Sequence, residues 1–297
     1  NANPSLPHPH MLPSVNPAAE PAGAGESTPY AAGSVAPIER LPTAVTAFVG
    51  RALKGPVNTP TLLGSFGEFQ QQFGGLWQPA TLGYAVEQFF ENGGRQALIV
   101  RVANGARAPT LRLPAGKGEL LLQGCNPGTR EYLRASVDYD GIGPADTDQF
   151  NLVLQRLRAA GTELIEEQEI LRRLSVVPGA ERSAGKILAR SRLMRLLGPL
   201  PAERPERTAS GIAGGAIGYV AARADAADGT DLTDYDLIGD PAAGSGLFAL
   251  RSGPHFGLLC VPPPARDRDV GAATLLVARQ LCRARQALLV VDPPASW

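Results

Sequence analysis

Serine, histidine and aspartate are the residue types that combine in hydrolases, and candidates for all three lie close together in the C-terminal third of the chain. A hydrolase needs a nucleophile, a base within hydrogen-bond reach and a group that orients the base. The candidates are Ser245, His255 and Asp240. Ser245 lies between Gly244 and Gly246, without the GxSxG spacing of a nucleophile elbow. We therefore interpret these residues as a helix start and a loop histidine, with a hydrolase as a remote alternative.

Phosphate-binding and calcium-binding loops also have weak counterparts in this sequence. Gly211 to Gly218, GIAGGAIG, has glycines that let backbone amides approach an anion, but it is neither GxGxxG nor a Walker A motif. The acidic stretch from Asp225 to Asp240 contains DGTDLTDYD, which lacks the ordered oxygen ligands and terminal Glu of an EF-hand loop. We expect tight turns and capping residues, and a nucleotide-binding enzyme stays a remote alternative.

Histidines and cysteines give no pattern typical of a metal site. His8 and His10 lie in a proline-rich segment with no third ligand nearby. Cys125, Cys260 and Cys282 are far apart and form no CxxC pair, which favours buried free thiols in a reducing compartment. The sequence therefore predicts no catalytic residues, no cofactor and no metal.

Charge and hydropathy restrict the classes of partner. The 28 Lys and Arg balance the 28 Asp and Glu, so we expect no direct contact with nucleic acid or with an anionic membrane. No window approaches eighteen unbroken apolar residues, and no basic segment followed by an apolar core opens the chain. The arginine-rich stretch Arg182 to Arg195 favours the solvated face of a helix, and a patch for an acidic partner is the alternative.

The N-terminal half combines an extended segment with layered strands and helices. Residues 1–37 are rich in Pro, Ala, Gly and Ser and have too few large apolar residues to offset chain entropy, so an extended arm is predicted. Thr43 to Val49 and Ala97 to Val102 favour buried strands. Between them we predict two amphipathic helices, one capped by Ser65 with Glu68 and ended by Gly74, the other capped by Thr81.

The middle of the chain favours short strands, and the C-terminal third returns to mixed structure. The expected strands are Glu119 to Leu122, Tyr132 to Tyr139 and Phe150 to Leu157, while Glu163 to Leu174 fits a solvated helix or an edge strand. Ser183 to Leu197 is predicted to be a helix, followed by the linker PLPAERPER.

Asp240 followed by Pro241 predicts another helix start, because Asp accepts from free amides and Pro has no amide that needs a partner. After it we expect buried strands at Leu258 to Val261 and Ala287 to Val291, joined by a helix from about Asp269 to Arg285. The fold class is therefore α/β (α+β), with layers of helices on sheets. The expected division is an arm over 1–37, a first core part over 38–109, an inserted β subdomain over 110–180 and a second core part over 181–297.

Several segments, in their order along the chain, carry a resemblance to a known family. These segments are PIERLPTAVTAFVG, AFVGRALKGPV, FGGLWQPATLGYAVEQFFENGG, NPGTREYLRASVDY, FNLVLQRL, LTDYDLIGDPAAGSGLFAL and LLVVDPP. Together they resemble the tail sheath proteins of contractile phages, tailocins and contractile injection systems, from about Tyr30 to Pro294. No single segment is a catalytic signature, and the match rests on several unrelated positions in one order.

The resemblance implies a structural subunit of a virion tail or injection-system particle, assembled in the bacterial host cytoplasm, and no enzyme. Such subunits stack in six-fold rings around an inner tube, contract, and exchange strands with neighbours through arms at the chain ends. The implied partners are other sheath subunits, the inner tube protein, and baseplate and tail terminator proteins. On this basis the arm segment is the candidate subunit interface, with these residues: Tyr30, Ser34, Val35, Pro37 and Ile38.

The chain departs from the family's pattern after the last predicted strand, where family members continue into a further C-terminal region. We therefore expect either a fragment or a shortened, non-contracting connector at the baseplate or the sheath terminus. Missing strands would leave a sheet edge and apolar surface uncovered.

Overall fold

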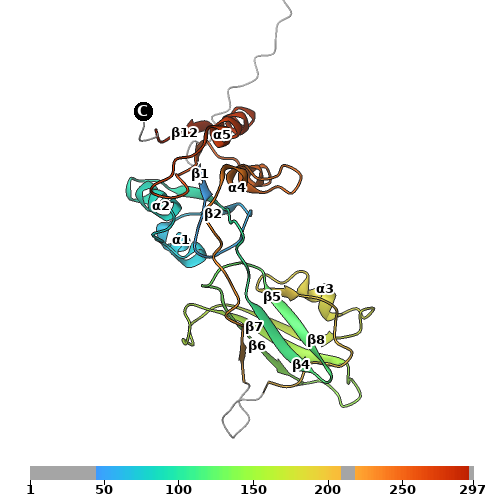
Figure 1. Cartoon of the computed structure of the whole chain (residues 1–297). Helices are drawn as coiled ribbons and strands as arrows, with labels where there is room; N and C mark the ends of the chain where they lie inside the picture. The colour runs from blue at the N-terminus through green and yellow to red at the C-terminus, as the bar shows by residue number, and fades with distance from the viewer. Residues whose placement is uncertain (1–44, 209–217, 294–297) are drawn as a thin grey trace, which may run out of the picture. The chain divides into compact units, whose positions relative to one another are not determined.

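The computed structural model describes residues 45–208 and 218–293 (Figure 1). The predicted arm with its five candidate interface residues, the histidines His8 and His10, and most of the glycine run lie outside the described residues. The described part of the chain begins at Val45, the first residue of strand β1.

A five-stranded sheet forms the α/β part of the described chain. Its strand order is β12-β11-β1-β3-β2, and every neighbouring pair is parallel except β2 with β3. The predicted strands at all four positions are present. The bounds are β1 Val45–Gly50, β2 Thr61–Leu63, β3 Gln96–Arg101, β11 Leu258–Cys260 and β12 Leu288–Val290. β1 and β3 are almost entirely buried, as expected for a parallel sheet covered on both faces.

Two helices, α1 Phe66–Phe73 and α2 Leu82–Glu91, cover one face of this sheet. The Ser65 hydroxyl accepts from the Glu68 amide and Gly74 ends α1 in the left-handed conformation, so both predicted signals for α1 are confirmed. Thr81 precedes α2 but does not cap it through its side chain. The Thr81 backbone is already helical, with φ −95° and ψ −17°, and its hydroxyl donates to the Pro263 carbonyl in the loop after β11.

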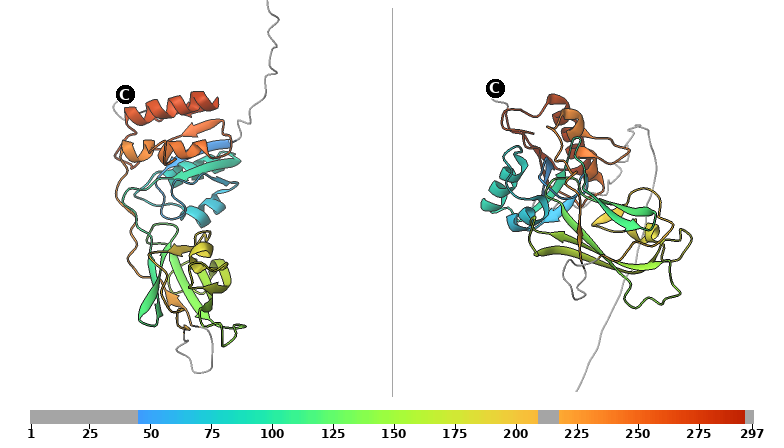
Figure 2. Two further views of the ribbon diagram at one scale, coloured as in Figure 1. Left: turned by 90° about the vertical axis from the view of Figure 1, so that its right-hand side faces the viewer. Right: turned by 60° about the horizontal axis from the view of Figure 1, so that its bottom comes forward.

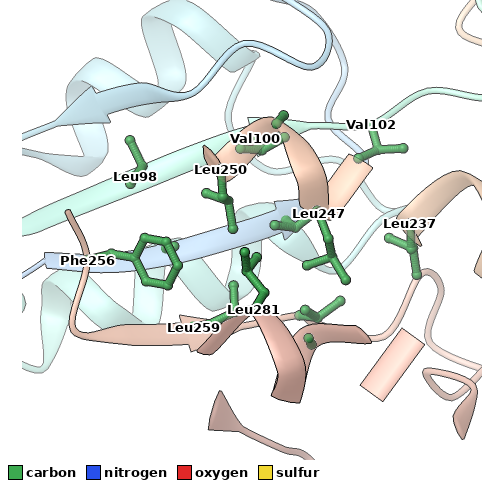
Figure 3. Packing of buried hydrophobic residues seen from close by; sticks show 14 of the residues in the cluster. Leu98, Val100, Val102, Leu237, Leu247, Leu250, Phe256, Leu259 and Leu281 are labelled. Carbon is green, nitrogen blue, oxygen red and sulfur yellow. The ribbon is translucent and has the colours of Figure 1, made fainter. Parts of the chain in front are cut away.

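Three short or medium helices cover the opposite face. They are α4 Asp234–Ile238, the 3-10 helix η1 Gly246–Arg251 and α5 Ala272–Arg285. Figure 3 shows their apolar side chains packed on those of β1, β3 and β11. Leu247, Leu250 and Phe256 are fully buried in this cluster. This packing fixes the C-terminal third of the chain onto the same sheet as the N-terminal strands.

The predicted helix start at Asp240 is wrong. The helix in this region is α4, and it begins seven residues earlier with a capping box between Thr233 and Asp236. Glycines with positive φ at positions 239, 244 and 246 then interrupt the backbone, so only a turn and a 3-10 helix follow. The local capping pattern of Thr233 therefore outweighs the Asp-Pro pair.

The β-rich part contains two sheets that share one apolar core. One sheet has the order β10-β6-β7-β8 and the other β4-β5-β9. Figure 2 shows the β-rich part, mostly green to yellow, in two further views. The region that fitted either a helix or an edge strand is the edge strand β8. The bounds are β4 Thr110–Ala115, β5 Gly118–Gly124, β6 Tyr132–Asp138, β7 Gln149–Leu157, β8 Ile165–Ser175, β9 Met194–Leu196 and β10 Val220–Ala221.

The helix predicted over Ser183 to Leu197 is mostly wrong. Only α3, Ala184–Leu188, is helical, and β9 follows within the same range. The Ser191 hydroxyl accepts from the amides of Leu193 and Met194, which turns the chain sharply after α3. β9 then pairs with β5, a contact between distant residues that helical periodicity cannot reveal.

The proline-rich segment Pro199 to Arg207 is held against the β-rich part, so it is not a free linker. Arg204 stacks 3.8 Å from the centre of the Tyr139 ring and donates to the carbonyls of Asp146 and Gln149. The Tyr139 hydroxyl donates to the Pro205 carbonyl at 2.6 Å. These contacts order a segment whose composition alone suggests an extended connection.

Candidate assembly surface

The candidate hydrolase residues do not form a catalytic arrangement in the structure. The Ser245 hydroxyl accepts from the Asp240 amide at 2.8 Å, and the Ser245 amide donates to the Asp240 carbonyl at 3.1 Å. Ser245 is therefore a turn residue at the start of η1. His255 Nε2 is buried and has no hydrogen-bond partner within the described ranges. Ser245 and His255 are thus not joined as a nucleophile and its base.

The carboxylates of the acidic stretch are each used by a nearby group. Asp225 accepts from the amide and hydroxyl of Thr110, and Asp228 accepts from the amide and hydroxyl of Thr129. Burial acts to raise the pKa of Asp225, but the Thr110 hydrogen bonds outweigh it and lower that pKa. Among residues 45–208 and 218–293, no three His, Cys, Asp or Glu side chains are grouped to hold a metal ion.

The three cysteines are free thiols, as the sequence predicts, although only Cys282 is fully buried. Burial raises the pKa of Cys260 to about 12 and that of Cys282 to about 11, while the nearby Asp292 adds to the effect on Cys260. Burial likewise raises the pKa of Cys125. All three thiols stay protonated at neutral pH, so none has the thiolate character of a nucleophile.

The arginine-rich stretch is used mainly inside the β-rich part. Arg182 donates twice to the Arg172 carbonyl, and Arg192 pairs with Glu167 at 3.0 Å. Because the stretch is helical only over α3, it does not present the solvated helix face that the sequence suggests. No helix of the described chain is long and apolar enough to cross a membrane.

One cavity of about 880 Å³ lies where the loop after β1 meets the β-rich part. Its lining includes six charged side chains that pair with one another: Lys54 with Glu166, Arg156 with Glu131 and Glu167, and Arg192 with Glu167. These six side chains neutralise one another's charge. They therefore connect the loop after β1 to the β-rich part and do not form a catalytic site.

The clearest unusual surface lies at the β12 edge of the five-stranded sheet. Leu288 and Val290 align with Leu258 and Cys260 of β11, and Cys260 aligns in turn with Phe48 of β1. Phe48 belongs to the cluster beneath α1 and α2, so all these side chains lie on that face. The exposed fraction is 67% for Leu288 and 45% for Val290. We call these four residues, Leu258, Cys260, Leu288 and Val290, the β12 face.

This exposure conflicts with what a parallel sheet normally requires. Strands of parallel sheets are usually covered on both faces, and sheet edges are usually protected by charges, prolines or covering elements. β12 has a covered face, where Leu289 packs against the α5 side, and an open face with large apolar side chains. The β12 face therefore has the character of a contact surface for another polypeptide.

The sequence predicts β12 as a buried strand, and this part of the prediction is wrong. The apolar run LLVV is typical of a fully buried strand, because periodicity reports composition and not which elements lie next to the strand. The sequence does indicate that some sheet edge and apolar surface would be left uncovered. It did not identify Leu288 and Val290 as the residues concerned.

Comparison with solved structures shows which known proteins have a similar fold. No protein-family model matches the chain, and no curated protein matches it. The chain is similar to the solved structure of a sheath tail protein from Listeria innocua, with 11% identity and a TM-score of 0.51, over 85% of this chain and 48% of that one. A sheath tail protein from Desulfitobacterium hafniense gives 12% identity and a TM-score of 0.43, over 85% and 50%. The chain thus spans about half the length of the solved structures it matches.

Proposed function

We propose that this chain is a structural subunit of a contractile tail sheath, a mechanical polymer without an active site. The observation that carries the proposal is the fold, which the Listeria innocua sheath tail protein shares at a TM-score of 0.51. Fold alone does not specify function, so the sequence segments that resemble the sheath family form the second support. The exposed β12 face is the third, because a subunit that assembles needs such contact surfaces.

The sequence predicts an arm over 1–37, α/β core segments over 38–109 and 181–297, and an inserted β subdomain over 110–180, and we propose this division with one change. Strands β9 and β10 pair with β5 and β6, so we extend the inserted part to include them. The arm is proposed to add a strand to a neighbouring subunit's sheet, since main-chain hydrogen bonds connect subunits without a large apolar patch. Its proposed contact residues are Tyr30, Ser34, Val35, Pro37 and Ile38.

The proposed partners are other copies of the subunit, an inner tube protein, and baseplate and tail terminator proteins. The particle would be a virion tail or an injection system assembled in the host cytoplasm. Repeated head-to-tail contacts between identical subunits produce rings or helical arrays, which is the geometry that a sheath requires. Contraction would require two subunit arrangements that differ in interface free energy, because the sequence has no motif for a chemical fuel.

A second candidate is a shortened, non-contracting connector at the baseplate or sheath terminus. The fold shared with the Listeria innocua sheath tail protein fits this candidate as well, because fold alone does not separate a contracting subunit from a connector. A connector shares the fold and the open β12 face but would form a single ring and would not continue into a tube. The two candidates therefore differ in the extent of assembly.

Removal of residues 1–37 tests the proposal. We expect the full chain to form sedimenting polymers, and the shortened chain to keep the same circular dichroism spectrum but remain small. A hydrolase or nucleotide-binding enzyme does not depend on this segment for its fold or activity. Polymers that form equally well without the segment would contradict the arm's proposed role, and absence of any polymer from either chain would contradict the sheath assignment.

A further inference from the structure

The loop after β1 is in contact with buried charged side chains that have no role in the proposed function. This loop, residues 51–60, connects β1 to β2 and contacts the β-rich part through Lys54 and Gly55. It is held by a buried arginine of β3 and by carboxylates of the β-rich part. Charged side chains therefore connect the five-stranded sheet to the β-rich part at this loop, and we call this connection the joint.

Arg101, the last residue of β3, is the centre of the joint. Its guanidinium is fully buried and donates to the carbonyls of Ala52 at 2.9 Å, Gly55 at 2.5 Å and Pro127 at 2.8 Å. Burial lowers the pKa of Arg101 to about 10, and the fields of Glu131 and Asp228 oppose this shift. The group therefore stays charged at neutral pH, and the carbonyl oxygens solvate it in place of water.

A displacement of the β-rich part would remove this solvation. Pro127 lies in the turn that precedes β6, whereas Ala52 and Gly55 lie in the loop of the α/β part. If the two parts separated, Arg101 would keep its charge but lose an acceptor on one side. A buried charge without its hydrogen-bond partners is strongly unfavourable. The contacts of Arg101 therefore oppose any movement of the β-rich part away from the five-stranded sheet.

Two carboxylates of the β-rich part hold the same loop from the other side. Lys54 Nζ lies 3.0 Å from Glu166 Oε2, and each side chain is only 9% exposed. The Glu131 side chain is 1% exposed, accepts from the Gly55 amide, and pairs with Arg156 Nε at 3.0 Å. Because these groups are shielded from water, their interactions are stronger than those of surface ion pairs.

We propose that Arg101, Lys54, Glu131 and Glu166 form a latch that couples the five-stranded sheet and the β-rich part into one cooperative unit. The two parts then open and unfold together, and the chain does not bend at the loop after β1. The proposal concerns coupling within one chain and does not depend on the proposed function.

Hydrogen–deuterium exchange of the full chain, read by mass spectrometry, tests this coupling. The slowest-exchanging amides of β3 and β7 report on the two parts separately. The latch variant is Lys54→Met with Glu166→Gln, which removes both partners and leaves no lone buried charge. The matched control is Arg112→Met with Glu119→Gln, a pair that is 50% and 41% exposed and lies within the β4–β5 hairpin.

We expect β3 and β7 to exchange at matching rates in the wild type and in the control variant. In the latch variant, β7 should exchange about tenfold or more faster than β3, since its opening no longer requires global unfolding. Equal rates for the two strands in the latch variant would overturn the proposal. A wild type in which the two rates already differ by about tenfold would overturn it as well, because the parts would be uncoupled with the latch intact.

Discussion

The carboxylate of Asp234 occupies the space beside the Gly271 backbone and holds the start of α5. Asp234 Oδ1 accepts from the Gly271 amide at 3.1 Å and from the Thr274 hydroxyl at 2.9 Å. A Cβ atom on residue 271 would lie 1.8 Å from Asp234 Oδ2, closer than any real contact. The first residue of α4 thus caps α5 across 37 residues of sequence, and the cap requires glycine at its partner position.

Gly271→Ala is therefore expected to destabilise the protein, although the backbone of residue 271 has an ordinary φ of −71°. The new methyl group forces Asp234 away and removes both hydrogen bonds, so we expect a loss of about 1–3 kcal/mol in the free energy of unfolding. Urea denaturation measures it. Gly179→Ala is the control, because no described residue has an atom within 4 Å of its added Cβ. Equal stability of the two variants would contradict the cap.

The buried thiols should contribute a loss of stability in alkali. The pKa of Cys260 rises from 9.0 to about 12 and that of Cys282 from 9.0 to about 11 in the folded chain. Between pH 9 and those values the unfolded chain releases protons that the folded chain retains, so the free energy of unfolding decreases as pH rises. Below pH 9 both states hold these protons and the thiols contribute no slope.

Denaturation at a series of pH values from neutral upward measures this effect. We expect the double variant Cys260→Ala and Cys282→Ala to have a flatter alkaline slope than the wild type, whatever its stability at pH 7. The comparison of slopes separates titration from packing, because lost packing shifts stability at every pH. Two parallel pH profiles would show that these thiols do not titrate as described.

The β12 face should control self-association. Replacing Leu288 and Val290 by serine removes the apolar side chains from an exposed position, so the fold is retained while the contact surface is lost. Sedimentation velocity should show smaller species for this double variant than for the wild type. Leu164→Ser is the control, since Leu164 is 58% exposed in the β-rich part. Loss of association in the control alone would place the contact elsewhere.

Local signals along the chain predict α1 well and fail where distant residues decide. The Ser65 cap, the phenylalanine spacing and Gly74 all act within one helix, and the structure contains that helix. The Asp240 start fails because the Thr233 capping box lies just upstream and glycines with positive φ follow. The Ser183 helix is cut short because Met194 to Leu196 pair with β5, which lies about 70 residues earlier in the chain.

The β12 face and the buried contacts of Arg101 are harder still to predict from the sequence. The run Leu288 to Val291 has the composition of a buried strand, but its position at the edge of the sheet leaves one face open. Arg101 ends an apolar strand like any solvated arginine, yet it is fully buried by loops 46 to 49 residues upstream and 26 residues downstream. Both outcomes depend on which distant segments meet, and residue types alone do not record that.

Negative-stain electron microscopy of the purified chain tests the central claim most directly. We expect long striated tubes whose diffraction shows a regular stack of six-fold rings, formed over a range of protein concentration. Isolated rings that never stack would support the connector. A protein that remains monomeric at every concentration would contradict the claim that this chain is a sheath subunit.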